Sequence, residues 1–87
     1  MNYNIPWTAK RIERFLRERT RTEEDPEVPF TWIEDHVLSL EDVDRTPRWV
    51  IVAAVGALVG SGSARMRVWK RDQSEVEEVK IRYLPPA

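Results

Sequence analysis

The 87-residue sequence contains no cysteine, a single histidine and no long apolar run. Without cysteine the chain can form no disulfide and offers no thiolate to a metal, and His36 alone does not make a zinc site. The longest apolar run, Trp49 to Val59, has 11 residues, whereas a membrane-spanning helix needs about 20. Residues 1–10 lack the features of a secretory signal. We therefore expect no metal, no cofactor, no membrane contact and a cytoplasmic location.

Signals for an enzyme are also missing. The chain has only three glycines, Gly56, Gly60 and Gly62, and they end an expected helix instead of following a strand, so they do not make a nucleotide-binding loop. His36 lies near Ser39 and Asp35 on one short expected helix, a placement that does not give the geometry of a hydrolytic triad. The sequence predicts a protein that is not an enzyme, with no catalytic residues.

The composition is that of one folded domain. Hydrophobic residues make up 41% and charged residues 33% of the chain, which is too apolar for a disordered segment and ordinary for a globular one. A chain of this length buries a modest core, so we treat residues 1–87 as a single domain.

Charge is segregated along the chain, although the net charge is only −1. Residues 1–21 have a net charge of +4, residues 22–44 carry nine acidic and no basic side chains, and residues 45–87 again have a net charge of +4. Such a chain can present a basic face without the overall excess that attracts phosphate unspecifically.

The N-terminal part predicts a helix over about residues 8–19, because Ile12, Phe15 and Leu16 recur at helical spacing. One side of this helix is basic, which suits either a solvated face or contacts to phosphate. The members of this stripe are Lys10, Arg14, Arg17 and Arg21. Residues 20–30 are acidic, contain two prolines and predict a loop. This loop is either a solvated connector or a negative surface that faces a basic partner.

Two further helices are expected after the loop. Thr31 and Glu34 have the spacing of a capping box, which predicts a second helix over about residues 31–40. Its expected buried set is Trp32, Ile33, Val37, Leu38 and Leu40. Thr46 as the N-cap, with Pro47 at the first helical position, predicts a third helix over about residues 46–60.

The third helix is apolar on both sides. We expect it to bury Ile51, Val52, Val55, Leu58 and Val59. Its other side carries Trp49 followed by small residues, namely Ala53, Gly56 and Gly60. That surface allows close approach of another chain but has no hydrogen-bonding side chain.

From about residue 64 to residue 84 the period changes to two, which predicts a two-stranded β-hairpin. The expected buried face consists of Met66, Val68, Val79, Ile81 and Tyr83. The expected outer face is basic and consists of Arg65, Arg67, Trp69, Arg71, Lys80 and Arg82, with Glu78 beside them.

Three helices followed by a hairpin, with the passage from Val55 to Gly62 leading into Ala64 to Val68, resemble the winged helix-turn-helix superfamily. The resemblance implies an α+β, mainly helical fold in which the third helix enters the DNA major groove and the hairpin, the wing, contacts the backbone. Carried over by position, the groove contacts are Arg45, Thr46, Arg48 and Trp49. The wing contacts are Arg65, Arg67, Trp69, Lys70 and Arg71. The chain departs from the usual pattern in that the third helix lacks polar side chains after Arg48 and the second helix is acidic.

Two functions remain open at this point. The first is a small DNA-binding protein, a dimeric transcriptional regulator whose partner is double-stranded DNA. The second is a protein-interaction module that docks a second copy or another protein on Trp49, Ala53 and Gly56.

Overall fold

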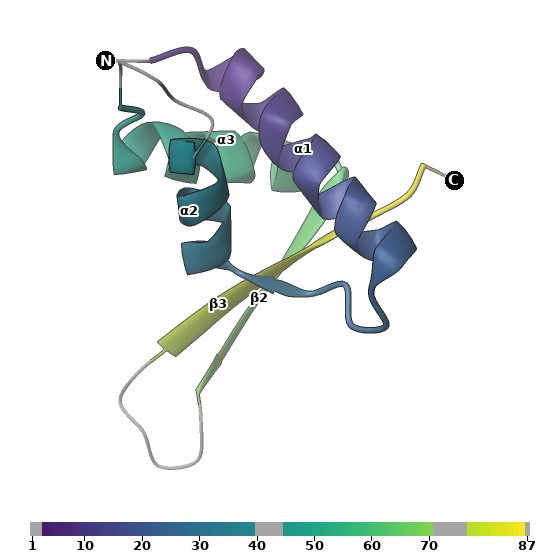
Figure 1. The fold of residues 1–87 in the computed structure, drawn as a ribbon. Coiled ribbons are helices and arrows are strands. Elements are labelled where there is room, and N and C mark those ends of the chain that lie inside the picture. The colour runs from purple at the N-terminus through teal and green to yellow at the C-terminus, as the bar shows by residue number, and fades with distance from the viewer. Residues whose placement is uncertain (1–2, 40–44, 71–76, 87) are drawn as a thin grey trace.

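The computed structural model describes residues 3–39, 45–70 and 77–86 and has a mixed α+β fold that is mainly helical (Figure 1). Three helices are combined with a small antiparallel sheet. In chain order the elements are α1 (Ile5–Thr22), β1 (Val28–Pro29), α2 (Phe30–Ser39), α3 (Arg48–Gly60), β2 (Ala64–Lys70) and β3 (Glu77–Tyr83).

Helix α1 is longer at both ends than the sequence predicts. It begins at Ile5 because Asn4 is its N-cap, with Oδ1 accepting a hydrogen bond from the Trp7 backbone N–H at 2.9 Å. Pro6 fits the first turn, where its missing N–H is not needed. At the other end the helix continues to Thr22, into the stretch predicted to be a loop.

The predicted loop over residues 20–30 also contains a strand that the sequence did not indicate. Strand β1 pairs antiparallel with β3, through Val28 with Ile81 and Pro29 with Lys80. The predicted two-stranded hairpin is therefore part of a three-stranded sheet in the order β1-β3-β2. A proline is tolerated in β1 because β1 is an edge strand with one neighbour.

Helix α2 follows β1 directly, and this overturns the predicted capping box. The helix begins at Phe30, so Thr31 already lies inside it and does not cap it. Ile33 and Val37 are fully buried as predicted. Trp32 and Leu38 were predicted to be buried but are 48% and 38% exposed. Leu40 and the turn after it lie outside the described residues.

Helix α3 has its N-cap one residue later than predicted. Pro47 is the N-cap, and the carbonyl of Pro47 accepts hydrogen bonds from Val50 and Ile51, at 3.0 and 3.4 Å. Thr46 therefore precedes the cap and is buried. The buried residues of α3 are Val50, Ile51, Ala54, Val55 and Leu58. Val52, predicted to be buried, is 52% exposed, and Val59 is partly buried.

The end of α3 is fixed by a glycine turn. Gly62 has φ of 80° and its N–H donates to the Val59 carbonyl at 3.1 Å, while the Ser63 N–H donates to the Leu58 carbonyl at 2.9 Å. This is the Schellman arrangement, which needs a residue in the left-handed conformation. It turns the chain sharply into β2.

The core lies between the helices and one face of β3. Fully buried residues from α1, α2, β1 and β3 meet there, namely Ile12, Leu16, Ile33, Val37, Val28 and Ile81. Met66 and Val68 of β2 were predicted to belong to this core but are 50% and 51% exposed. They point to the same side as Ile81 and Val79, their partners in register, but β2 is an edge strand and the hairpin extends beyond the helices (Figure 1). No helix of the described residues is both long and apolar enough to cross a membrane.

Candidate nucleic-acid interface

The solvent face of the β2-β3 ribbon carries two rows of like charge. Arg65 lies directly opposite Arg82, and Arg67 lies directly opposite Lys80. Both strands alternate, so these four side chains share the face that is turned away from the core residue Ile81. We call this surface the basic sheet face.

Glu27, just before β1, brings a negative charge to this face. Its Oε2 accepts a hydrogen bond from Arg67 Nε at 3.0 Å, and its Oε1 accepts one from Arg67 Nη2 at 2.6 Å. These hydrogen bonds, aided by the charges of Arg67 and Lys80, hold the pKa of Glu27 below its ordinary value despite partial burial. The same pair raises the pKa of Arg67. One of the predicted wing contacts is thus already held by an acidic side chain.

Two further arginines belong to the basic sheet face. Arg65 and Arg82 are exposed, and no carboxylate of the described residues forms an ion pair with either. Together with Glu27 and Arg67 they line an open groove of about 260 Å³. All four of these residues are charged, and three of them are cations that an anion could contact.

Fewer groove contacts at the start of α3 are available to DNA than the sequence predicts. Arg45 is exposed, but Thr46 is only 3% exposed, so its side chain is not at the surface. Arg48 is exposed and its Nε lies 3.3 Å from Glu34 Oε2, with the guanidinium also over the ring of Phe30. Of the two arginines at the start of α3, Arg45 is exposed, whereas Arg48 is already paired with a carboxylate.

Trp49 is 57% exposed and stacks on Tyr3, with ring centroids 5.6 Å apart. This stack holds the indole against the segment that precedes α1. Trp69 and Lys70 are placed by their backbone as the last residues of β2, and Arg71 lies outside the described residues.

The predicted contacts fall on two surfaces instead of one. Arg48 lines a groove together with Met66, which points to the core side of β2. Arg65 and Arg67 alternate with Met66 and therefore point to the opposite side. A duplex lying flat on the basic sheet face is thus turned away from the start of α3.

The second surface is an apolar groove of about 320 Å³ between α3 and the sheet. Its lining residues are Phe30, Arg48, Val52, Val55, Gly56, Met66 and Val79. The sequence correctly places Trp49 and Gly56 on the exposed side of α3, while Ala53 is half-buried. It misses Val52 and Met66, because both were assigned to the core. We call this surface the apolar groove.

The described residues give little support for metal binding or for a hydrolytic site. They contain no group of three or more histidine, aspartate or glutamate side chains arranged to hold a metal ion. The Ser39 hydroxyl donates to the backbone carbonyl of His36 at 2.7 Å and is not aligned with the imidazole. No family model, no curated protein and no solved structure matches the chain.

Proposed function

We propose that this chain is a winged-helix module that binds double-stranded DNA through phosphate contacts from the basic sheet face. Three helices followed by the β2-β3 hairpin support the winged-helix assignment. Regulation of transcription is the role that the resemblance to winged-helix proteins adds to this proposal.

The observation that carries the proposal is the pairing of Arg65 with Arg82 in register. Like charges directly opposite each other on one face of a sheet are destabilising. The described residues bring two carboxylates to this face: Glu27, which is bound to Arg67, and Glu78, which lies four residues before Arg82 in β3 and opposite Trp69. A phosphate chain would neutralise Arg65 and Arg82 and release counterions from the DNA.

The proposed contacts position the protein on DNA without reading bases. Apart from Arg48, the exposed residues of α3 have none of the paired donors and acceptors that identify a base; they are Trp49, Val52, Gly56, Ala57 and Gly60. Arg48 is the one residue there that could do so, and it is bound to Glu34. We therefore expect affinity that depends strongly on salt and weakly on sequence.

The test is binding of a fluorescent duplex between about 50 and about 200 mM salt. The double variant Arg65→Gln/Arg82→Gln should bind more weakly than the parent chain, and its log–log salt slope should fall by about 2, since each lost phosphate contact removes about 0.9. Arg17→Gln/Arg21→Gln is the matched control, because it also removes two positive charges and both residues are exposed arginines of α1 that do not line the groove of Arg65 and Arg82.

Two results would contradict the proposal. One is the absence of duplex binding by the parent chain at about 50 mM salt. The other is an equal loss of affinity in the Arg17→Gln/Arg21→Gln control, which would mean that net charge and not the basic sheet face determines binding.

A second candidate function is self-association through the apolar groove. A two-fold interface brings a patch against its own copy, so unpaired charge on the patch would meet like charge. Among the described residues that line the apolar groove, Arg48 alone is charged, and Glu34 neutralises it at 3.3 Å. Gly56 leaves open space where a side chain would stand, which allows close approach of a second helix. The groove is thus compatible with a second copy of this chain.

Light scattering tests this second candidate. We expect a dimer at about 100 μM chain, converted to a monomer by Val52→Glu or Met66→Glu, since each puts like charges across the two-fold axis. Ala57→Glu is the control, because Ala57 is exposed on α3 but does not line the groove. A monomeric parent chain at this concentration, or dissociation by the control alone, would rule out the apolar groove as the dimer contact.

A further inference from the structure

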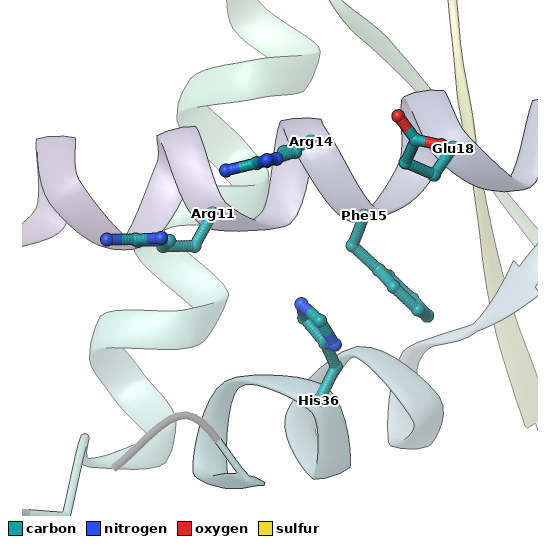
Figure 2. Close-up of a pocket in the computed structure, with 5 residues that line it drawn as sticks. All are labelled: Arg11, Arg14, Phe15, Glu18 and His36. Atoms are coloured by element: carbon teal, nitrogen blue, oxygen red, sulfur yellow. The ribbon is translucent and has the colours of Figure 1, made fainter.

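A third groove, of about 290 Å³, lies between α1 and α2, away from the β2-β3 sheet (Figure 2). Helix α1 supplies four of its residues at spacings of three, one and three, which places them on one side of the helix. They are Arg11, Arg14, Phe15 and Glu18. Helix α2 supplies His36, which rises toward Phe15.

The floor of this groove is aromatic. The rings of Phe15 and His36 stack with centroids 4.2 Å apart and an angle of 17° between their planes. Both residues are half-buried. Burial lowers the pKa of His36, so at neutral pH the imidazole is uncharged and offers one N–H donor. The groove is therefore lined by a stacked aromatic pair that carries one N–H donor.

The groove is also lined by two cations that have no carboxylate partner in the part of the chain that the structure describes. Arg11 and Arg14 are exposed, and neither forms an ion pair with a carboxylate of the described residues. Glu18 lies one turn beyond Arg14, but it points away from His36 and pairs with Arg21 at 3.7 Å. The Arg11 guanidinium lies over the Trp7 ring, 5.1 Å from its centroid, which positions the cation without neutralising it.

Two guanidinium groups and an aromatic pair line the same groove, and together they define what would bind. Each guanidinium can donate two parallel hydrogen bonds to an oxyanion, so two of them match a dianion better than a carboxylate. The Phe15–His36 stack provides a surface on which a further ring can lie. A DNA duplex offers phosphates, but its bases are stacked inside the helix. They therefore cannot pack against Phe15 and His36.

We infer that the groove between α1 and α2 binds a small aromatic phosphate monoester, with the phosphate held by Arg11 and Arg14 and the ring packed against Phe15 and His36. Aryl phosphates and nucleoside monophosphates share this chemistry. The inference is independent of DNA binding, because it uses no residue of the basic sheet face.

The single histidine makes a direct experiment possible. The His36 imidazole protons are the only histidine signals in the proton NMR spectrum of the chain. On addition of phenyl phosphate we expect these signals to shift and the pKa of His36 to rise, because a nearby dianion favours the charged imidazole. Inorganic phosphate should bind about tenfold more weakly, since it lacks the ring. Adenosine monophosphate serves as the nucleotide probe.

The variants separate the two parts of the site. Arg14→Gln and Arg11→Gln should each weaken phenyl phosphate binding about tenfold, while Arg17→Gln, on the same helix but outside the groove, should leave it unchanged. Phe15→Leu should reduce the affinity for phenyl phosphate to that for inorganic phosphate. All three arginines are exposed, so their variants should fold as the parent chain does.

Three results would overturn the inference. The first is no shift of the His36 signals at about 10 mM phenyl phosphate. The second is an equal loss of binding in Arg17→Gln. The third is a His36 shift that duplex DNA produces and phenyl phosphate does not, which would make the groove part of a nucleic-acid surface. Phenyl phosphate binding in a chain that fails to bind duplex would instead support this inference and reject the DNA proposal.

Discussion

Glu27 and Arg67 are 40 residues apart in sequence and form a two-point ion pair on the solvent face of the sheet. Glu27 immediately precedes β1 and Arg67 lies in β2, so the pair reaches across the central strand β3 and joins the two edges of the sheet. It also connects the acidic segment of the chain to the basic sheet face. The pair has consequences for both stability and binding.

The first prediction concerns the pH dependence of stability. Because the pKa of folded Glu27 lies below its ordinary value, the pair stabilises the fold at pH values above the ordinary carboxyl range and is lost as pH falls through the lowered pKa. Glu27→Gln should therefore lower the urea midpoint at pH 7, and the difference from the parent should vanish in strong acid. Glu24→Gln is the control, since Glu24 is exposed in the same segment. A difference that persists unchanged into acid would contradict this account.

The second prediction concerns duplex affinity. Glu27→Gln removes the carboxylate that holds Arg67 and leaves this guanidinium available to a phosphate. We expect tighter duplex binding and a salt slope that is steeper by about 0.9. Glu24→Gln makes the same change in net charge without freeing an arginine, so it should have a smaller effect on affinity and none on the slope. Equal behaviour of the two variants would show that Arg67 does not contact DNA.

The third prediction compares two residues that face each other in register. Ile81 is fully buried and its partner Met66 is 50% exposed. Ile81→Ala should lower the free energy of unfolding by about 2–5 kcal/mol, because it leaves a cavity in the core. Met66→Ala should change it by less than about 1 kcal/mol in the monomer, since the side chain is half in water. Urea denaturation followed by tryptophan fluorescence measures both changes. A large decrease in the free energy of unfolding of Met66→Ala would mean that Met66 belongs to the core.

The fourth prediction tests the helix caps. Asn4 caps α1 and accepts a hydrogen bond from Trp7, so Asn4→Ala should cost about 1 kcal/mol of stability. Thr31 lies inside α2, so Thr31→Ala should cost less than about 0.5 kcal/mol. Thermal unfolding by circular dichroism distinguishes these values. A larger loss in Thr31→Ala than in Asn4→Ala would mean that the capping box forms after all.

The fifth prediction uses two glycines with different backbones. Gly56 lies inside α3 and has open space where a side chain would stand, so Gly56→Ala should raise stability by about 0.5–1 kcal/mol. Gly62 has φ of 80°, so Gly62→Ala should lower stability by about 1–2 kcal/mol. Melting temperatures of the two variants should thus move in opposite directions from that of the parent. A shift of both in the same direction would contradict one of the two backbone assignments.

The helices and the hairpin could be predicted from the sequence because their signals are local. The apolar period of Ile12 and Leu16, the run from Trp49 to Val59 and the alternation around Ile81 each lie within one element. Strand β1 could not be predicted, since two residues show no period and its partner is some fifty positions away. The burial of Met66 was predicted wrongly because alternation gives the face of a strand but not how far the helices cover it.

The site was predictable to a similar extent. Alternation correctly placed Arg65 and Arg67 on the outer face, since direction depends only on neighbours along the strand. The pairing of Arg67 with Glu27 and that of Arg48 with Glu34 depend on which segments meet in space, and no local pattern contains that information. The same is true of the stack between Phe15 and His36, which joins two helices.

The order of the strands also bears on how the chain folds as it is made. β3 is the middle strand of the sheet and the last element along the sequence, so a ribosome releases both edge strands before the one they share. Until residues 77–83 emerge, Val28 has nothing to pair with, and the helices lack the side chain of Ile81. Nascent chains that stall before β3 emerges should therefore expose apolar surface. We expect chaperones to bind these chains.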